Sequence, residues 1–402
     1  MTKAFYAPDR RTLLTASLSL LGMAALPARV LAQAQSPSLE EAIFEVIRLQ
    51  PGYLKTLGIS STVILPGGES LSVTDGLADP DSGEPVTPST RFMSGSTGKT
   101  FCAATIMRLA EEGQLSLSDK TADLFGGEGW YDALPNAGSL TISHLLLHQG
   151  GFSQFLDMAD FQTKLLWDSM RGKSIAYTPN EMLGLLAGKP ALFEAGEGHH
   201  YSDMHYHLLG LVIEKVTAQS YYQALDALVI GRMSRFGDDI LAANTTDLPG
   251  LAAGYAKGDI LGRLSGMNGR TTHADGTLRN DPSLEYTGGG LALTPRALAQ
   301  FYADLAQGRI VTSETFSEMV SASEAPPNST HTPAYGYGLY VTEREGFGRY
   351  VTHSGFFPGY TSNVAFFLDH GVCVAIQQSS DHGPDLFTML REVARAVLDH
   401  SE

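Results

Sequence analysis

The chain has 402 residues, 43% of them hydrophobic, and a formal net charge of −16 at pH 7. An acidic surface repels nucleic acid and anionic membranes, so neither is expected as a partner. The apolar content is ample for a core, and the length indicates one large domain or two interleaved domains.

Residues 1–34 have the features of an export signal. A basic start is followed by an apolar run, and residues 32–34 form a small-x-small cleavage site. The pair Arg10-Arg11 resembles the twin-arginine motif of bacterial export. The apolar run is too short and too interrupted for a stable membrane anchor. We therefore expect cleavage after this signal and a periplasmic or secreted chain of residues 35–402.

Secondary structure is expected at both ends of this chain. Residues 39–49 carry apolar side chains at helical spacing. Two runs rich in β-branched residues, 59–65 and 70–76, predict a hairpin. Four further strand-like runs lie at 338–342, 349–353, 362–368 and 372–378. An amphipathic helix follows them near the C-terminus.

This order of elements predicts an α/β (α+β) fold. The two ends of the chain, about 40–113 and 286–402, would build one antiparallel sheet flanked by helices. A helical region of about 114–285 would be inserted between them. The glycine-rich stretch 250–290 is either a lid over a site or an ordinary surface loop.

The stretch 91–113 carries the strongest chemical signal. Ser96 and Lys99 are three residues apart, which places both side chains on one face of a helix. A serine hydroxyl becomes a nucleophile when a neighbouring base takes its proton, and a lysine in a dry site assists this transfer. The apolar residues that follow predict a buried helix with Ser96 at its N-terminus. Free backbone N–H groups there stabilise a developing oxyanion.

Two other interpretations of this stretch remain open at this point. Gly98-Lys99-Thr100 ends like a phosphate-binding P-loop, but Met93 stands where that loop needs a glycine. The plainest interpretation is a capped helix with a surface lysine. Partner residues elsewhere in the chain decide between these readings.

Two downstream segments supply such partners. Tyr201-Ser202-Asp203 lies on a predicted loop that leads into an apolar helix. His353-Ser354-Gly355 ends a strand-like run, where the glycine allows a ligand to approach the strand closely.

The chain thus resembles the serine β-lactamase and penicillin-binding-protein family, with its three motifs in the family's order: Ser96-x-x-Lys99, Tyr201-x-Asp203 and His353-Ser354-Gly355. Class C β-lactamases, D-alanyl-D-alanine carboxypeptidases and related esterases are the most similar members. Two supporting stretches are residues 145–151 and 287–291. The resemblance covers most of residues 40–400 and implies a β-lactamase-like fold.

The resemblance also implies the chemistry. Ser96 would attack a carbonyl group and form an acyl-enzyme, while Lys99 and Tyr201 share the proton transfer. Tyr201 is the expected general base, because Lys99 would lower its pKa. The substrate would be a small molecule or a peptide, and neither a metal nor another cofactor is expected. The oligomeric state stays open.

The same resemblance suggests the binding groups. The backbone N–H groups of Ser96 and Phe356 would form the oxyanion hole. His353, with Ser354 and Gly355, would face the carboxylate or the leaving group of the substrate, and Asp203 would lie beside the acyl group.

Two departures from the family pattern affect the substrate. Asp203 stands where the family has asparagine, and an ionised aspartate accepts hydrogen bonds but does not donate them. His353 stands where β-lactamases have lysine, and a neutral imidazole attracts a carboxylate less strongly. We therefore expect a carboxypeptidase-like or esterase-like hydrolase. The alternatives are a β-lactamase and an inert penicillin-binding-type ligand-binding protein.

Cysteines and histidines receive plainer interpretations. Cys102 and Cys373 lie in apolar runs, which favours two buried thiols over a disulfide. His144 and His148 are four apart and four more histidines lie within 199–207, but the familiar zinc motif is incomplete. Surface or hydrogen-bonded core histidines are expected.

Overall fold

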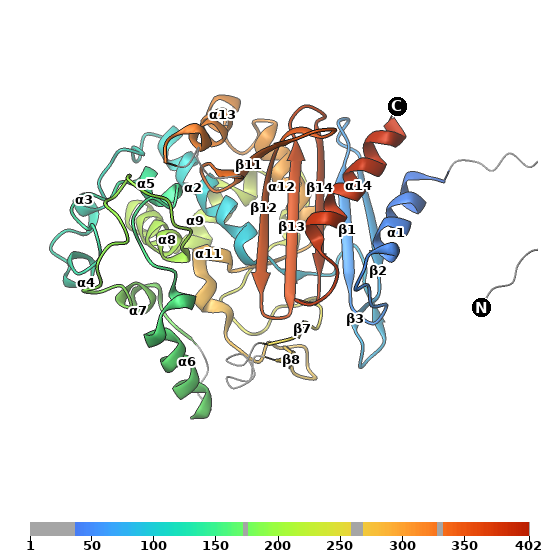
Figure 1. Ribbon diagram of the computed structural model, residues 1–402, viewed down its shortest axis with the longest axis horizontal. Coiled ribbons are helices and arrows are strands. Elements are labelled where there is room, and N and C mark those ends of the chain that lie inside the picture. Colours follow the sequence, from blue (N-terminus) through green and yellow to red (C-terminus); the bar gives the residue numbers. More distant parts are fainter. Residues whose placement is uncertain (1–36, 172–175, 259–267, 328–332, 402) are drawn as a thin grey trace, which may run out of the picture. The chain divides into compact units, whose positions relative to one another are not determined.

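The computed structural model describes residues 37–171, 176–258, 268–327 and 333–401 (Figure 1). The export signal expected over residues 1–34 lies outside these ranges. Within them, no helix combines the length and the apolar character needed to cross a bilayer.

A seven-stranded antiparallel sheet forms the centre of the fold, with the strand order β10-β11-β12-β13-β14-β1-β2 (Figure 1). The strands are β1 (Ile59–Ile64), β2 (Ser70–Asp75), β10 (Ala334–Tyr335), β11 (Tyr340–Arg344), β12 (Gly348–Phe357), β13 (Tyr360–Phe367) and β14 (Val372–Gln378). Strand β1 pairs with β14, so the two ends of the chain meet inside the sheet. The predicted hairpin and the predicted antiparallel sheet are both confirmed.

Helices cover both faces of this sheet. Helices α1 (Leu39–Leu49) and α14 (Leu386–Ser401) pack on one face, and α12 (Pro295–Ala306) packs on the other (Figure 1). Side chains along β14 alternate between the two cores: Val374 and Ile376 join the α1–α14 side, while Cys373 and Ala375 join the other. This period of two is the pattern of a strand buried on both sides.

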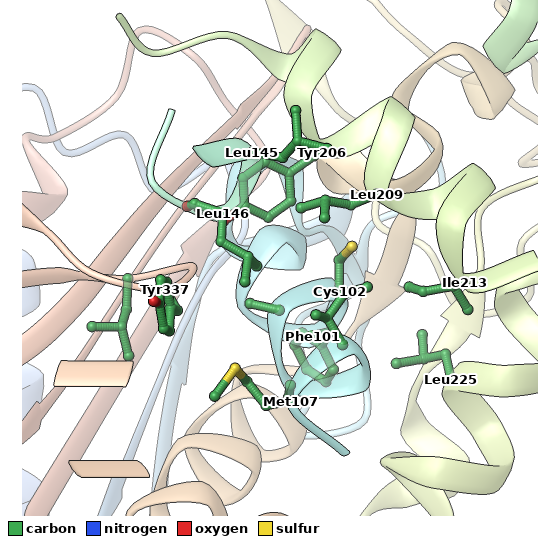
Figure 2. Close-up of a cluster of buried hydrophobic side chains, with 14 of the residues drawn as sticks. Phe101, Cys102, Met107, Leu145, Leu146, Tyr206, Leu209, Ile213, Leu225 and Tyr337 are labelled. Atoms are coloured by element: carbon green, nitrogen blue, oxygen red, sulfur yellow. Dashed lines mark hydrogen bonds between the residues drawn. The ribbon is translucent and has the colours of Figure 1, made fainter. Parts of the chain in front are cut away.

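Helix α2 (Gly98–Glu111) is the central element of the second core. Its neighbours are α8 (Asp203–Thr217), α9 (Tyr221–Leu228) and α11 (Tyr286–Gly289), and α5 (Ile142–Leu146) packs on α8. Phe101 and Met107 are at most 1% exposed, and Leu145 and Leu209 lie among the side chains packed around them (Figure 2). The prediction of a helix buried nearly all round is confirmed.

Both cysteines are buried free thiols, as favoured from the sequence. Cys102 belongs to α2, and Cys373 is the second residue of β14. Burial raises the pKa of each thiol above its ordinary value, so both remain protonated and unreactive.

Further helices complete the described part of the chain. They are α3 (Ala122–Phe125), α4 (Gly129–Asp132), α6 (Ala159–Met170), α7 (Pro179–Gly184) and α13 (Ser313–Ser321). The short strands are β3 (Leu77–Asp79), β4 (Glu84–Pro85), β5 (Phe92–Met93), β6 (Leu241–Ala242), β7 (Tyr255–Ala256), β8 (Gly269–Arg270) and β9 (Leu291–Leu293).

Strand β5 brings the start of α2 to the glycine-rich segment. It pairs antiparallel with β9, and the N–H of Ser94 donates to the carbonyl of Leu291 at 2.9 Å. The Ser94 hydroxyl donates to the Gly289 carbonyl at 2.7 Å. A two-residue strand in a small antiparallel sheet is not the parallel strand of a P-loop, so that interpretation is wrong.

Candidate active site

Ser96 lies in a single 3-10 turn, η1 (Gly95–Thr97), directly before α2. Strand β11 pairs only with residues 348–352 of β12, so the second half of β12 lacks this neighbour. The turn η1 packs there, and the Ser362 hydroxyl donates to the Ser94 carbonyl at 2.6 Å. Ser96 is therefore fixed at the start of the helix and beside the open half of a strand.

Two glycines make this close packing possible. Gly95 has φ +50°, and a methyl group on it would collide with the backbone of Phe356. A methyl group on Gly355 would collide with the carbonyl of Ser94. The strand that carries His353 and the turn that carries Ser96 therefore meet through their backbones.

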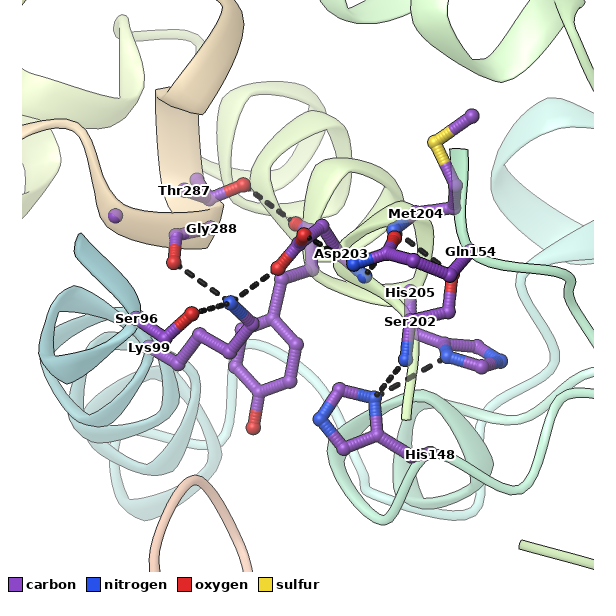
Figure 3. Close-up of polar contacts among 12 residues, drawn as sticks. Ser96, Lys99, His148, Gln154, Ser202, Asp203, Met204, His205, Thr287 and Gly288 are labelled. Carbon is purple, nitrogen blue, oxygen red and sulfur yellow. Dashed lines mark hydrogen bonds and ion pairs between the residues drawn. The ribbon is translucent and has the colours of Figure 1, made fainter. Parts of the chain in front are cut away.

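The ammonium group of Lys99 has three partners (Figure 3). It donates to the hydroxyl of Ser96 at 2.9 Å and to the carbonyl of Gly288 at 2.7 Å, and it forms an ion pair with the carboxylate of Asp203. The Lys99 side chain is fully buried. All three N–H bonds of the ammonium are used, so Lys99 is a charged donor in the resting site.

Asp203 is held on both carboxylate oxygens. One oxygen contacts Lys99, and the other accepts from the Gln154 amide at 2.6 Å (Figure 3). The Gln154 carbonyl accepts in turn from the N–H of Asp203 at 3.2 Å. Burial pushes the pKa of the Asp203 carboxyl upward, but the charge and hydrogen bonds of Lys99, together with Gln154, outweigh burial and hold the pKa below its usual value.

The loop that carries Tyr201 is pinned to the segment 148–154. His148 accepts from the N–H of His200 through its carbonyl at 3.0 Å, and from the N–H of Ser202 through Nδ1 at 3.3 Å. The Ser202 hydroxyl caps α8 and donates to the Ser153 carbonyl at 3.0 Å. The imidazole of His148 also packs on the Tyr201 ring, with 4.2 Å between the ring centres.

Tyr201 lies beside the other two catalytic candidates. The Lys99 ammonium is 5.1 Å from the centre of its ring. Its hydroxyl makes no hydrogen bond within the described ranges, yet it is near enough for the Ser96 hydroxyl to act on its pKa. The structure thus brings Tyr201 together with Ser96 and Lys99, from which it is far apart in sequence.

The expected lowering of the Tyr201 pKa is wrong for the resting site. Burial raises the pKa well above its ordinary value, the charge of Asp203 raises it further, and the Ser96 hydroxyl opposes this only in part. The ammonium of Lys99 is already paired with Asp203, so its charge is not free to stabilise a phenolate. Tyr201 is therefore a neutral phenol before substrate binds.

His353 lines the site as an uncharged side chain. It is 1% exposed, its Nδ1 donates to the Ser354 carbonyl at 2.7 Å, and its Nε2 lies 3.2 Å from the Tyr335 hydroxyl. Burial, aided by the charge of Lys99, lowers the pKa of His353 to about 3. Its expected role toward a substrate carboxylate stays a prediction, and it would act there without a positive charge.

Two cavities open on either side of Ser96. The narrower one has a volume of about 210 Å³, and Ser96, Tyr201, Asp203 and Glu285 lie in its wall. The rest of that wall is mainly apolar, with Phe155, Leu156, Phe161, Leu165, Leu278, Leu284, Phe356 and Phe357. The wider cavity, about 500 Å³, runs along β12 past His353, Ser354 and Gly355 to Phe387. A substrate bond held at Ser96 would have one half in each cavity.

The predicted oxyanion hole lies where the turn that carries Ser96 meets the backbone of β12. The backbone of Phe356 lies against Gly95, next to Ser96, and the N–H of Ser96 belongs to the turn η1 directly before α2. The proximity of these two backbone segments agrees with the predicted pair of donors. Their role stays a prediction.

Two polar residues of the site were not singled out from the sequence. Gln154 stands three residues after the stretch 145–151 and clamps Asp203. Glu285 stands two residues before the stretch 287–291 and lies in the wall of the apolar cavity. Nearness to a motif was the available signal for both.

Of the six histidines within 144–148 and 199–207, His148, His205 and His207 are core residues, whereas His144, His199 and His200 are only partly buried. His148 and His205 are fully buried, and their Nδ1 atoms are 3.3 Å apart. Burial lowers the pKa of both imidazoles, that of His205 to about 3. In the part of the chain that the structure describes, no three His, Cys, Asp or Glu side chains gather as metal ligands would.

A buried lysine bonded to a serine at a helix start, beside an open strand, defines a site of the serine β-lactamase and penicillin-binding-protein fold. The model of the Beta-lactamase family matches residues 48–398. The chain belongs to this family, which includes serine hydrolases such as esterases.

Curated relatives match a part of the chain. It is 28% identical to Protein flp of Staphylococcus aureus over 182 residues, 44% of this chain and 32% of that protein. It is 32% identical to Esterase EstB of Burkholderia gladioli over 155 residues, 38% of this chain and 39% of the esterase. The matched segments therefore span well under half the length of these relatives.

Solved structures match nearly the whole chain. A D-stereospecific amidohydrolase from Streptomyces sp. superimposes with a TM-score of 0.73 at 22% identity, covering 90% of this chain and 98% of that one. The D-amino acid amidase from Ochrobactrum anthropi SV3 gives 0.71 at 22%, covering 90% and 99%. A penicillin-binding protein homologue from Pyrococcus abyssi gives 0.67 at 24%, covering 90% and 77%. These likenesses establish the fold.

Proposed function

We propose that this protein is a serine hydrolase that forms an acyl-enzyme through Ser96 and cleaves an amide or ester bond with an apolar acyl group. The observation that carries the proposal is the 2.9 Å hydrogen bond from the buried Lys99 ammonium to the Ser96 hydroxyl, at the point where two cavities meet. A structural lysine would have no reason to be buried beside a serine that faces a cavity.

The proton route follows from the charge states of the site. The Lys99 ammonium forms an ion pair with the Asp203 carboxylate, and Tyr201 is a neutral phenol. As Ser96 attacks, its proton passes to the Tyr201 oxygen while the Tyr201 proton passes to the leaving group. Tyr201 is thus neutral again at the end of the step. The Lys99 cation stabilises the negative charge that develops on the Ser96 and Tyr201 oxygens during the transfer. Apo hydrogen bonds of this kind are often long and tighten when substrate binds.

The two cavities suggest how a substrate lies. The narrower, mainly apolar cavity suits the acyl group, because burying apolar surface there is favourable. The wider cavity along β12 suits the leaving group. Among the similar proteins, an esterase and a D-amino acid amidase are named for the two bond types proposed here.

Two narrower activities receive less support. A D-alanyl-D-alanine carboxypeptidase must recognise a terminal carboxylate, and His353 offers a neutral ring with both nitrogens occupied. A β-lactamase uses an amide donor toward the acyl amide, and the Asp203 carboxylate accepts only. The geometry therefore favours an esterase or amidase over these two and over an inert ligand-binding protein.

We also propose that the chain is exported, from the pattern of basic and apolar residues at 1–34. Replacing Arg10 and Arg11 by lysine together should leave the precursor in the cytoplasm if the twin-arginine route is used. Normal secretion of the double variant would reject that route.

The hydrolase proposal is tested with a series of p-nitrophenyl esters of increasing acyl length. We expect kcat/KM to rise from acetate to a medium-length acyl chain, and Ser96→Ala to lose at least about a thousandfold. A surface serine variant, Ser82→Ala, serves as the matched control. Hydrolysis that survives in Ser96→Ala at the wild-type rate would overturn the proposal.

A further inference from the structure

Glu285 is a partly buried carboxylic acid in the wall of the narrower cavity. It is the last residue of the 3-10 turn η5 (Pro282–Glu285) and directly precedes α11. A Cβ atom built on Gly289 would lie 2.9 Å from its Oε2, and that glycine also packs against Gly95. The carboxyl group therefore lies close to the backbone of the Ser96 turn.

The backbone next to Glu285 is strained. Tyr286 has φ +39° and ψ −121°, which a bulky side chain rarely adopts. Such conformations persist where the surrounding structure imposes them, and they gather at functional sites. This conformation lies at the junction between η5, which ends at Glu285, and α11.

Among the described residues, no positively charged side chain serves as a counter-ion for Glu285. Lys99 and Asp203 neutralise each other, and the described residues offer Glu285 neither an ion pair nor a hydrogen bond to its side chain. Arg270 also lines the cavity, but Asp79 and Asp81 take its charge. An ionised Glu285 would therefore leave one uncompensated negative charge in an apolar cavity.

Among the described residues, the other charged groups of this wall form no ion pair with Glu285. Asp281 accepts from the N–H of Ser283 at 2.8 Å, and Arg279 donates to the carbonyl of Thr272 at 3.1 Å. The charges that act on the carboxyl of Glu285 are those of Asp203 and Lys99.

We propose that Glu285 binds a positively charged group of the substrate, an alkylammonium carried on the acyl half near the bond that Ser96 attacks. The apolar wall would take the hydrocarbon part of that acyl group, and the single carboxylate would take its amine. The assignment of the cavity to the acyl half rests on the proposed function. The cation site itself rests on the carboxyl group of Glu285, which has no counter-ion among the described residues, and on the apolar wall around it.

The free protein supports this role through its protonation. Burial raises the pKa of Glu285 to about 8, with Asp203 raising it further against the opposing charge of Lys99. At neutral pH a proton therefore occupies the site where the ammonium would bind. A bound ammonium replaces that proton, because an opposite charge favours the ionised carboxylate. Cation binding at neutral pH should release up to about one proton per site.

Binding of two matched probes tests the proposal. The probes are 2-phenylethylammonium and the neutral 2-phenylethanol, measured by calorimetry at pH 8 on the full chain carrying Ser96→Ala. An alkylammonium stays protonated to about pH 9, like a lysine side chain. We expect the cation to bind at least about tenfold tighter than the alcohol, as charge-assisted hydrogen bonds do.

Two variants in the same background locate the preference. Glu285→Gln keeps the shape of the side chain but not its charge, and it should reduce the preference to within about threefold. Asp281→Asn removes a neighbouring carboxylate from the same wall and should keep the preference. Repeating the titration at pH 7 in buffers of different ionisation enthalpy should show proton release for the cation and none for the alcohol.

The outcomes separate this proposal from the hydrolase proposal. An absence of binding, equal affinity for both probes, or a preference unchanged in Glu285→Gln would overturn the cation site, even if the protein hydrolyses esters. A preference that depends on Glu285 in a protein without hydrolytic activity would keep the cation site and reject the function. Thermal melting of each variant confirms that it is folded before it is titrated.

Discussion

Lys99 and Asp203 form a buried ion pair whose cation also donates a hydrogen bond to the hydroxyl of Ser96. This contact links the residue that departs from the family pattern directly to the nucleophile. Asp203 is the counter-ion of Lys99, and its carboxylate also lies in the wall of the cavity proposed for the acyl group. The pair therefore sets both the proton route and the recognition of the acyl group.

Breaking this ion pair from one side should destabilise the fold. Lys99→Met leaves the Asp203 carboxylate buried without its partner, at a cost of about 3–5 kcal/mol. Lys99→Met combined with Asp203→Asn removes both charges and should recover part of that loss. Urea unfolding at pH 7 measures the free energy of unfolding of both variants. The difference between the single and the double variant should narrow below about pH 5, as Asp203 of the single variant takes up a proton. A double variant no more stable than the single one would contradict the account.

Asp203→Asn should change the substrate preference. The asparagine amide can donate toward an acyl amide, whereas the carboxylate only accepts. We expect penicillin acylation to rise by roughly ten- to a hundredfold relative to hydrolysis of a p-nitrophenyl ester, the range for a hydrogen bond with a charged group. Values of kcat/KM for both substrates decide it, with the exposed Asp226→Asn as control. An unchanged ratio, or one that moves toward the ester, would reject this role of Asp203.

Glu285 should make stability depend on pH. Its folded-state pKa of about 8 lies above the ordinary value of 4.5, so the folded state binds more protons between these values. The stabilising contribution is complete below the unfolded pKa and is lost as pH rises through the folded pKa. Melting temperatures of the wild type should therefore fall from pH 5 to pH 8.5 relative to those of Glu285→Gln. Parallel curves for the two proteins would show that the carboxyl is not shifted.

His148 should act by positioning Tyr201. His148→Ala removes the acceptor of the Ser202 N–H and the ring that packs on Tyr201. We expect kcat to fall at least about tenfold with a small change in KM, because only the transition state needs the tyrosine hydroxyl in place. His148→Asn should recover part of the rate, since asparagine tolerates the φ of +57° and keeps an acceptor. A rise in KM together with the fall in kcat, without recovery in His148→Asn, would indicate a structural role alone.

Much of the fold was predictable because local patterns encode it. The apolar spacing over 39–49 gave the bounds of α1, and the Pro66-Gly67-Gly68 turn between two β-branched runs gave the hairpin of β1 and β2. The three motifs gave Ser96, Lys99 and Tyr201, because each motif precedes or ends a strongly apolar element.

The unpredicted features depend on contacts between distant segments. Gln154 reaches Asp203 across 49 residues, and Gly288 reaches Lys99 across 189. The pKa of Tyr201 could not be foreseen from motif spacing, because burial and the Lys99–Asp203 pair determine its direction. Glu285 stood in a loop without periodicity, and only the cavity shows that it faces the site.

The most direct test of the central claim is the site of covalent labelling. The purified protein is treated with a fluorophosphonate and digested, and the modified peptide is identified by mass spectrometry. The account predicts a single label on Ser96, absent in Ser96→Ala and strongly slowed in Lys99→Met, since the Lys99 ammonium contacts the Ser96 hydroxyl at 2.9 Å. A label on any other serine, or an equal rate of labelling in Ser96→Ala, would contradict it.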